Sequence, residues 1–194
     1  MTFGIDIAAR RFDDLDKILL YEIEPSSTVL EVGCGSGTLA NKLHENGVSV
    51  IATDITPLKT ASLDFIQNDA RRISDVLQNK SFDYAICQRM LHYLSYQEAQ
   101  VFLKTLHYSV TKKLYISVSG LESEIGNHYQ NASANVSERH NELTRLGKEL
   151  FSIKEPVCLY TVAEFQVLLE ETGWVVEKIW TSAFGNHKAI AFAK

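Results

Sequence analysis

The length, composition and charge of the chain limit the classes of protein to which it can belong. It has 194 residues, 45% of them hydrophobic, which suffices for one core in a single domain over 1–194. A formal net charge of −5 argues against a broad phosphate-binding surface, so nucleic acid is not expected as a partner. Three cysteines without C-x-x-C spacing favour a reduced, cytoplasmic protein without a metal site. No stretch is long or apolar enough to span a membrane.

Short apolar runs alternate with segments of helical periodicity along the chain. The expected strands are 28–32, 49–53, 62–67, 82–87, 113–119, 174–180 and 187–192. Helical faces are expected between them, at 12–19, 39–43, 101–106 and 165–169. This alternation predicts a three-layer α/β fold with a seven-stranded, mostly parallel sheet. Because only the segment 181–186 joins the last two strands, we expect the C-terminal strand to pair antiparallel.

One connection is longer and more polar than the others. Residues 120–156 separate the fifth expected strand from the next helix, and a helix is expected near 137–150 with Leu143, Leu146 and Leu150 on one face. A long connection at the carboxyl end of a sheet can form a lid or a wall for a substrate. It can equally be an ordinary surface elaboration, and the sequence leaves both interpretations open.

The most specific motif is a glycine cluster that directly follows the first expected strand, within 29–38. Gly33, Gly35 and Gly37 permit a tight turn with positive φ and allow a ligand to lie against bare backbone. Dinucleotide oxidoreductases use a related turn to bind a pyrophosphate. Here Glu31 stands just before the turn, where it would disfavour a pyrophosphate and could face a cationic amino group or anchor the loop.

Two acidic residues at the ends of the next two strands fit a nucleoside. Asp54 ends the second strand, where an acid can accept both hydroxyls of a ribose. Asp69 follows the third strand, where a carboxylate can accept the exocyclic amine of adenine. Either acid taken alone could cap a helix. Their joint spacing behind the glycine cluster favours a nucleoside site, and binders of NAD do not normally need the second acid.

With these motifs the chain resembles the Rossmann-like (class I) S-adenosylmethionine-dependent methyltransferases, over 12–192 except for 120–156. The segment 81–94 is similar to the family's fourth motif. The resemblance implies S-adenosylmethionine as cofactor and S-adenosylhomocysteine as product. It places the backbone of Gly33, Gly35 and Gly37 and the side chains of Glu31, Asp54, Ile55, Asp69, Ala70 and Gln88 at the cofactor. Arg11, in the amino-terminal helix, is a further candidate because an arginine there would pair with the methionine carboxylate.

The expected reaction is an in-line transfer of a methyl group from a sulfonium to a nucleophile. Such a transfer depends on alignment and on exclusion of water more than on a large set of catalytic groups. His92, after the fourth strand, is the candidate base for an acceptor that must lose a proton, although a packed or capping histidine is the simpler interpretation. We expect a small-molecule acceptor at the carboxyl ends of the strands. A nicotinamide-dependent oxidoreductase and a non-catalytic cofactor-binding scaffold are the alternatives.

Overall fold

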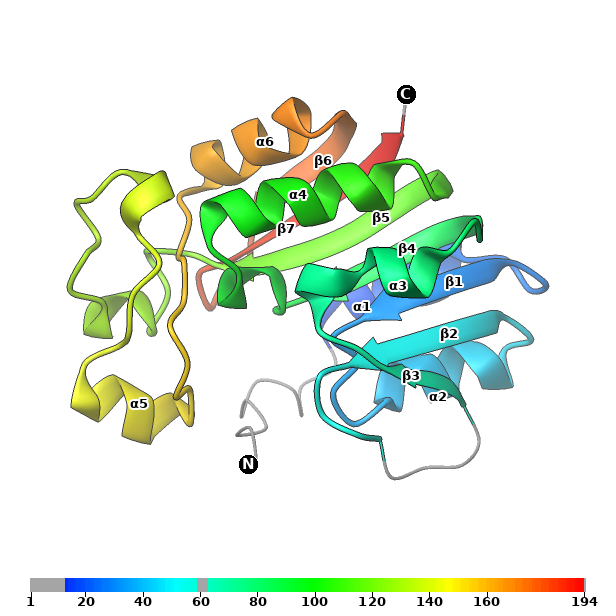
Figure 1. The fold of residues 1–194 in the computed structure, drawn as a ribbon, viewed down its shortest axis with the longest axis horizontal. Coiled ribbons are helices and arrows are strands. Elements are labelled where there is room, and N and C mark those ends of the chain that lie inside the picture. Colours follow the sequence, from blue (N-terminus) through cyan, green and yellow to red (C-terminus); the bar gives the residue numbers. More distant parts are fainter. Residues whose placement is uncertain (1–12, 59–62, 194) are drawn as a thin grey trace.

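A twisted sheet runs through the middle of the molecule and carries helices on both faces (Figure 1). The computed structural model describes residues 13–58 and 63–193, and in these ranges seven strands form the sheet. They are β1 (Thr28–Val32), β2 (Ser49–Asp54), β3 (Asp64–Gln67), β4 (Phe82–Gln88), β5 (Val110–Ser119), β6 (Trp174–Thr181) and β7 (Asn186–Ala193). The strand order is β3-β2-β1-β4-β5-β7-β6. The three-layer, mostly parallel sheet predicted from the sequence is therefore confirmed.

Strand β7 is antiparallel to both of its neighbours, β5 and β6, whereas the other pairs are parallel. The short β6–β7 connection enforces this arrangement, as the sequence predicts. Strand β5 begins at Val110, three residues before the expected start at Lys113. The side chains of Thr111 and Lys112 near the start of the strand are exposed. This end of the strand therefore has no apolar run from which it could be predicted.

The helices divide between the two faces of the sheet (Figure 1). They are α1 (Asp14–Glu22), α2 (Thr38–Glu45), α3 (Ser74–Leu77), α4 (Tyr96–His107), α5 (Arg145–Phe151) and α6 (Val162–Glu171), with short 3-10 turns η2 (Ala70–Arg72), η3 (Leu91–Tyr93), η4 (Gly126–His128) and η5 (Val136–Glu138). Leu30 and Val32 of β1 pack in the core with α3, α4 and α6, whereas Val29 packs with α1 and α2. Because side chains alternate along a strand, Glu31 points toward α1 and α2.

Helix α1 is held against the sheet by polar side chains that lie in one row across neighbouring strands. Lys188 of β7 is 2% exposed, and its Nζ lies 2.6 Å from Oδ2 of Asp13 and also contacts Asp14. Trp180 of β6, the register partner of Lys188, donates from Nε1 to Asp14 at 2.8 Å. These contacts fix the first turn of α1, which the N-cap Asp13 begins.

The prediction of one helix near 137–150 is wrong in the extent of that helix. The chain forms η5 and then α5, which begins only after Thr144 caps it through the N–H of Gly147. Between them Asn141 forms an antiparallel bridge with Val157 through two backbone hydrogen bonds of 3.0 and 2.9 Å, which extends the chain and interrupts a helix. Of the three leucines expected on one face, Leu143 is buried, whereas Leu146 and Leu150 are exposed.

The segment 120–156 nevertheless has an apolar core of its own. This core comprises Tyr129, Leu143 and Ile153 of the segment together with Val157 and Leu159, which directly follow it, and Tyr93 of η3 packs against it. Arg139 joins the segment to α6, since its guanidinium donates two hydrogen bonds, of 2.6 and 2.8 Å, to the carboxylate of Glu164. The same guanidinium donates to the carbonyls of Ala134 and Leu159. The Arg139 side chain is only 5% exposed, so the pair is largely desolvated on one side.

We expect Arg139→Met to lower the free energy of unfolding by about 2 to 4 kcal/mol, because it removes the donor to two carbonyls and leaves Glu164 with the N–H of Thr161 but without its charged partner. Arg145→Met is the matched control, since that side chain is 94% exposed and pairs with Glu149 one turn further along α5. Urea unfolding of both variants and of the unmodified chain measures the difference. Equal and small losses in the two variants would show that the Arg139 pair does not anchor the segment.

Candidate active site

The glycine turn lies at the carboxyl end of β1, between the ends of β2 and β4 (Figure 1). Gly33, Gly35 and Gly37 have φ of +76°, +55° and +71°, as the sequence predicts for a tight turn. The N–H groups of Gly33 and Cys34 donate to the carbonyl of Thr53 at 2.8 and 3.0 Å, which ties the turn to β2. The turn is thus fixed by backbone contacts on one side.

Two of these glycines serve different purposes. A Cβ added to Gly33 would lie 2.6 Å from Cβ of Met90, so the close approach of β1 and the loop after β4 requires a glycine there. A Cβ added to Gly35 would meet no atom within 4 Å among the described residues. Gly35 therefore presents bare backbone to open space, where a ligand can lie against it.

Asp54 connects the glycine turn to the end of β2. Its Oδ2 accepts the N–H of Gly35 and its Oδ1 accepts the N–H of Thr56, both at 2.8 Å. The structure thus brings Asp54 to the glycine turn, and its contact with a ribose stays a prediction. Each carboxylate oxygen has a second lone pair, so both can still accept a hydroxyl. Ile55, directly after it, is 44% exposed, a position from which it could cover a flat ring.

Asp69 has partners that the sequence analysis did not identify. Its Oδ1 caps η2 by accepting the N–H of Arg71 at 3.0 Å, and the guanidinium of Arg71 lies 3.3 Å from the same oxygen. Arg71 also donates to Glu98 of α4 at 2.8 Å. Ala70 is half-buried at the start of η2. The contact of Asp69 and Ala70 with adenine stays a prediction, and Arg71 fixes the carboxylate that would make it.

Glu31 is the most unusual acid of the site. It is 6% exposed, and its Oε2 has no hydrogen-bond partner among the described residues. Burial, followed by the nearby carboxylates of Asp16 and Asp54, raises the pKa of Glu31 to about 8, against the opposing effect of the backbone N–H of Ala40. At neutral pH the side chain is therefore mostly protonated.

Asp16 is a site residue that the sequence analysis missed. It belongs to α1, and its Oδ1 accepts a hydrogen bond of 2.7 Å from Nε2 of Gln88 at the end of β4. Its Oδ2 accepts the N–H of Asp13 in a capping box. The spacing of Asp13 and Asp16 signals a helix start in the sequence. It does not reveal that Asp16 faces Glu31, because that depends on how α1 packs on the sheet.

His92 lies in η3 behind the end of β4. It is 2% exposed, its Nδ1 has no hydrogen-bond partner among the described residues, and its ring packs on Tyr93 with 4.4 Å between ring centres. Burial and the charge of Arg89 lower the pKa of His92 to about 3, so the ring is neutral at physiological pH. Its role as a base stays a prediction. Arg11, the candidate partner of the methionine carboxylate, lies outside the described residues.

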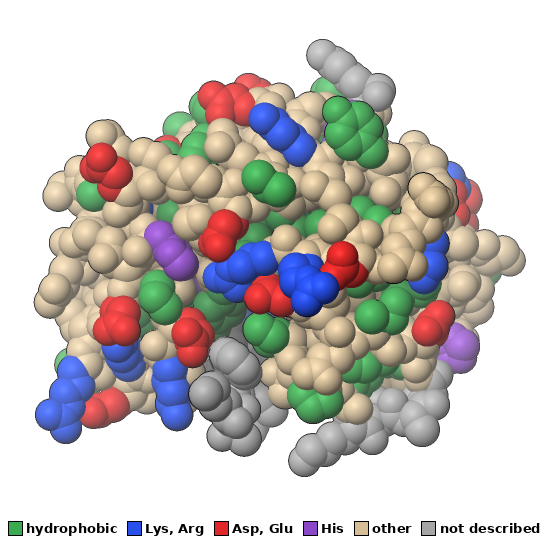
Figure 2. Space-filling view, viewed as in Figure 1, with side chains coloured by type: hydrophobic (Ala, Val, Ile, Leu, Met, Phe, Trp, Pro, Cys, Tyr) green, Lys and Arg blue, Asp and Glu red, His purple; other side chains and the backbone are tan. Residues whose placement is uncertain are grey.

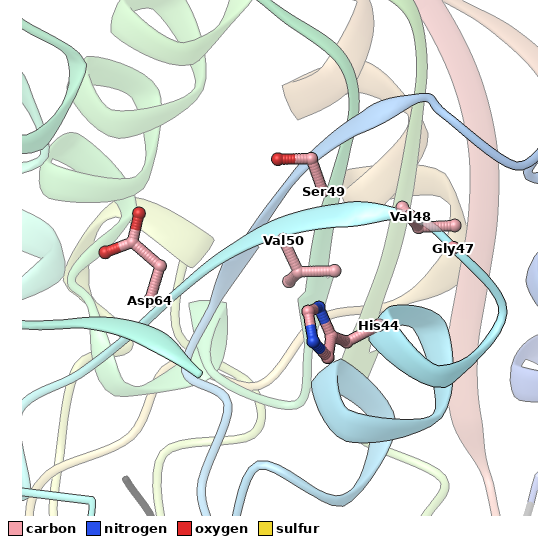
Figure 3. A pocket seen from close by; sticks show the side chains of 6 residues that line it. All are labelled: His44, Gly47, Val48, Ser49, Val50 and Asp64. Atoms are coloured by element: carbon pink, nitrogen blue, oxygen red, sulfur yellow. The ribbon is translucent and has the colours of Figure 1, made fainter. Parts of the chain in front are cut away.

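Other kinds of site find no support in the parts of the chain that the structure describes. There, no group of three or more His, Cys, Asp or Glu side chains is placed to hold a metal ion. In the same ranges no helix is long and apolar enough to cross a membrane. A shallow pocket lies at the start of β2 and β3, the opposite end of the sheet, and is lined by His44, Gly47, Val48, Ser49, Val50 and Asp64 (Figure 3). It is separate from the glycine turn.

The raised pKa of Glu31 has a consequence for stability. The carboxyl ionises near 4.5 in the unfolded chain and near 8 in the folded chain, so between these values the folded protein binds the extra proton and loses stability as pH rises. We expect Glu31→Gln to remove this loss. Its gain in free energy of unfolding over the unmodified chain should be larger at about pH 8 than at about pH 5, by on the order of 3 kcal/mol.

Urea unfolding at both pH values measures this difference, with Glu45→Gln on the exposed end of α2 as the control. A gain that is independent of pH would mean that Glu31 is not buried in its protonated form.

Known proteins resemble this chain in fold and in sequence family. Solved structures of similar fold include a Rhodobacter sphaeroides protein provisionally named a Zn-dependent alcohol dehydrogenase, with 18% identity, a TM-score of 0.72, and coverage of 97% of this chain and 92% of that chain. They include the Burkholderia thailandensis 1,6-didemethyltoxoflavin-N1-methyltransferase with bound S-adenosylhomocysteine. It has 16% identity and a TM-score of 0.68, and the match covers 98% of this chain and 80% of that chain. The magnesium protoporphyrin IX methyltransferase of Synechocystis PCC 6803, also with bound S-adenosylhomocysteine, is similar too. It has 16% identity and a TM-score of 0.67, and the match covers 94% of this chain and 81% of that chain.

At these identities the likeness establishes the fold. No curated protein matches the sequence. The family described as methyltransferase domain matches residues 6–179, which is most of the chain. The chain therefore belongs to the methyltransferase domain family.

Proposed function

We propose that this protein transfers a methyl group to a small molecule bound at the carboxyl ends of β1, β4 and β5. Its cofactor is S-adenosylmethionine, which leaves as S-adenosylhomocysteine, and the protein is an S-adenosylmethionine-dependent methyltransferase. The turn from Gly33 to Gly37 is the observation that supports a cofactor site at these residues. Asp54 accepts the N–H of Gly35 in this turn, and the space beside Gly35 is open. The nucleoside would lie on this turn, with its ribose hydroxyls on Asp54.

The electrostatics of the turn favour a sulfonium cofactor over a nicotinamide dinucleotide. Glu31 and Asp16 lie behind the turn, on the side where a dinucleotide would place its pyrophosphate. A pyrophosphate there would be repelled by the carboxylate of Asp16 and would favour the neutral form of Glu31, whereas a cationic ligand would be attracted. The likeness to the Rhodobacter sphaeroides protein concerns the fold alone and does not weigh against this conclusion.

We expect Gly35→Val to abolish binding of S-adenosylhomocysteine, because its side chain would enter the space that the ligand occupies. Gly47→Val is the matched control. Gly47 also has positive φ, +81°, but lies at the far end of β2 and meets only Pro25, at 3.8 Å. Calorimetry with S-adenosylhomocysteine and with NAD tests both the site and the cofactor. Normal S-adenosylhomocysteine binding by a folded Gly35→Val chain would place the cofactor elsewhere.

A small-molecule acceptor is supported by the charge of the surface. Figure 2 shows acidic and basic side chains interspersed on the face covered by α3, α4 and α6, where no basic stripe is visible. Together with the net charge of −5, this disfavours a nucleic-acid acceptor. The cytoplasmic location predicted from the sequence is compatible with three free, buried cysteines.

The segment 120–156 is placed to form the wall of the acceptor pocket. In Figure 1 it lies beyond the carboxyl ends of the strands. Its core packs on Tyr93, and His140 lies 3.3 Å from the carbonyl of Tyr93, so it contacts the loop that follows β4. A wall there would exclude water from the transfer. In the Arg139→Met variant we therefore expect lower methyl transfer at unchanged affinity for S-adenosylhomocysteine.

His92 is the proposed base for an acceptor that must lose a proton. Its ring is neutral, but burial lowers its pKa to about 3 and makes it a weak base, so the loop around η3 has to open and admit the acceptor before the ring can accept a proton. We expect His92→Asn to lower transfer by about 10²- to 10⁴-fold for a hydroxyl acceptor found in a panel of small molecules. Binding of S-adenosylhomocysteine should not change. Full activity in this variant would identify His92 as a packed residue, and the transfer would then need alignment alone.

A further inference from the structure

The side chain of Arg71 links the base end of the proposed cofactor site to the loop that follows β4. Arg71 belongs to η2, directly after Asp69 and Ala70. Its Nε donates to Oε1 of Glu98 in α4 at 2.8 Å, and one terminal nitrogen lies 3.3 Å from Oδ1 of Asp69. The other terminal nitrogen donates to the carbonyl of Tyr93 in η3 at 3.1 Å. One planar guanidinium therefore contacts three separate parts of the chain.

Each of these acceptors has a place in the site or next to it. Asp69 is the acid proposed to meet adenine, and its Oδ2 lies only within 3.4 Å of the guanidinium, so that oxygen can still accept an amine. Glu98 belongs to the capping box that begins α4. Tyr93 ends η3, the turn that contains His92. Arg71 thus connects the adenine acid to the backbone beside the candidate base.

The backbone of η3 is held from several directions. Nε2 of His140, in the segment 120–156, lies 3.3 Å from the same carbonyl of Tyr93 that accepts from Arg71. The carbonyl of His92 accepts the N–H of Cys158 at 2.7 Å. Two of these three contacts come from residues in the segment or just after it. The contact from Arg71 comes instead from the turn at the cofactor site.

The geometry of the Arg71 cluster suits positioning better than stabilisation. The side chains of Arg71, Asp69 and Glu98 are all partly exposed, and ion pairs that water can reach contribute little to folding. A guanidinium, however, directs its donors in one rigid plane, so its three acceptors cannot move independently while all the hydrogen bonds are made. A lysine ammonium has no such fork and could keep the charge beside Asp69 without fixing the other two acceptors.

We propose that Arg71 is a positioning residue for methyl transfer, which transmits occupancy of the adenine site to η3 and so orders the acceptor side once the cofactor is bound. The inference rests on the proposed function and goes beyond it. An adenine amine that donates to Asp69 fixes this carboxylate, the carboxylate fixes the guanidinium, and the guanidinium fixes the carbonyl of Tyr93. Because such coupling is reciprocal, an ordered η3 strengthens cofactor binding by the same factor.

Hydrogen exchange measured by mass spectrometry, with and without saturating S-adenosylhomocysteine, tests this coupling. Exchange in the glycine turn, 33–38, reports binding, and exchange in 91–98 reports the order of η3 and the start of α4. In the unmodified chain the ligand should slow exchange in both regions, by about fivefold or more in 91–98. The matched ligand is the analogue with purine as its base, which lacks the exocyclic amine. It should slow exchange in the glycine turn and hardly at all in 91–98.

Three variants locate the effect in the guanidinium. Arg71→Met should keep the slowing in the glycine turn and lose most of it in 91–98. Arg71→Lys should show the same loss, with an affinity for S-adenosylhomocysteine closer to that of the unmodified chain. Arg72→Met is the matched control, because Arg72 lies in the same turn, is far more exposed and pairs with Asp75 at 2.6 Å. It should behave like the unmodified chain. A purely structural role of Arg71 would change exchange in the empty protein and leave the effect of the ligand as it was.

The outcomes separate this inference from the proposed function. If S-adenosylhomocysteine slows 91–98 equally in the unmodified chain and in Arg71→Met, or in neither, the coupling is overturned and the cofactor site stays in place. Equal slowing of 91–98 by both ligands would also overturn it, since the effect would not pass through Asp69. No slowing in the glycine turn of the unmodified chain would overturn the proposed function itself. The unmodified chain with the two ligands decides the matter even if Arg71→Met fails to fold.

Discussion

The hydrogen bond from the backbone N–H of Gly35 to Asp54 fixes how the ends of β1 and β2 lie relative to each other. It joins a turn that needs positive φ to Asp54 at the end of β2, so the proposed nucleoside site has backbone on one side and a carboxylate on the other. Since Gly33 must also pass close to Met90, the turn has little freedom to move. The rest of the site is arranged around this fixed edge, with β4 and its loop on one side and β2 on the other.

A second constraint is the density of negative charge behind that edge. Asp16 reaches Glu31 only because α1 is oriented by its first turn, where Lys188 and Trp180 hold the acidic residues Asp13 and Asp14. The lysine is almost fully buried, so its positive charge is compensated locally by these two carboxylates and does not neutralise Glu31. The fold thus holds a cation at the start of α1 and leaves the neighbouring acid cluster to be neutralised by a proton or a ligand.

The glycine turn and Asp54 could be predicted from the sequence because each depends on local chemistry at a strand end. The partners that complete the site could not. Gln88 was expected beside the methionyl group, but its hydrogen bond to Asp16 depends on the packing of a helix 72 residues away in sequence. The helix expected at 137–150 failed because the bridge between Asn141 and Val157 overrides a helical period. Periodicity indicates which side chains are apolar. It does not indicate which backbone groups form hydrogen bonds with distant parts of the chain.

The burial of His92 and the architecture of the segment 120–156 have a common origin. The N–H of Cys158, just after that segment, donates to the carbonyl of His92 at 2.7 Å, and the segment's core rests on the neighbouring Tyr93. A segment with its own core and with Arg139 bound to α6 is better suited to a fixed wall than to a freely moving lid. At the proposed acceptor site, entry would then be past the loop at η3 rather than under a hinged flap. In the proposed function, selectivity for the acceptor would therefore depend on the shape of this wall, whereas cofactor affinity would depend on the glycine turn and the acids behind it.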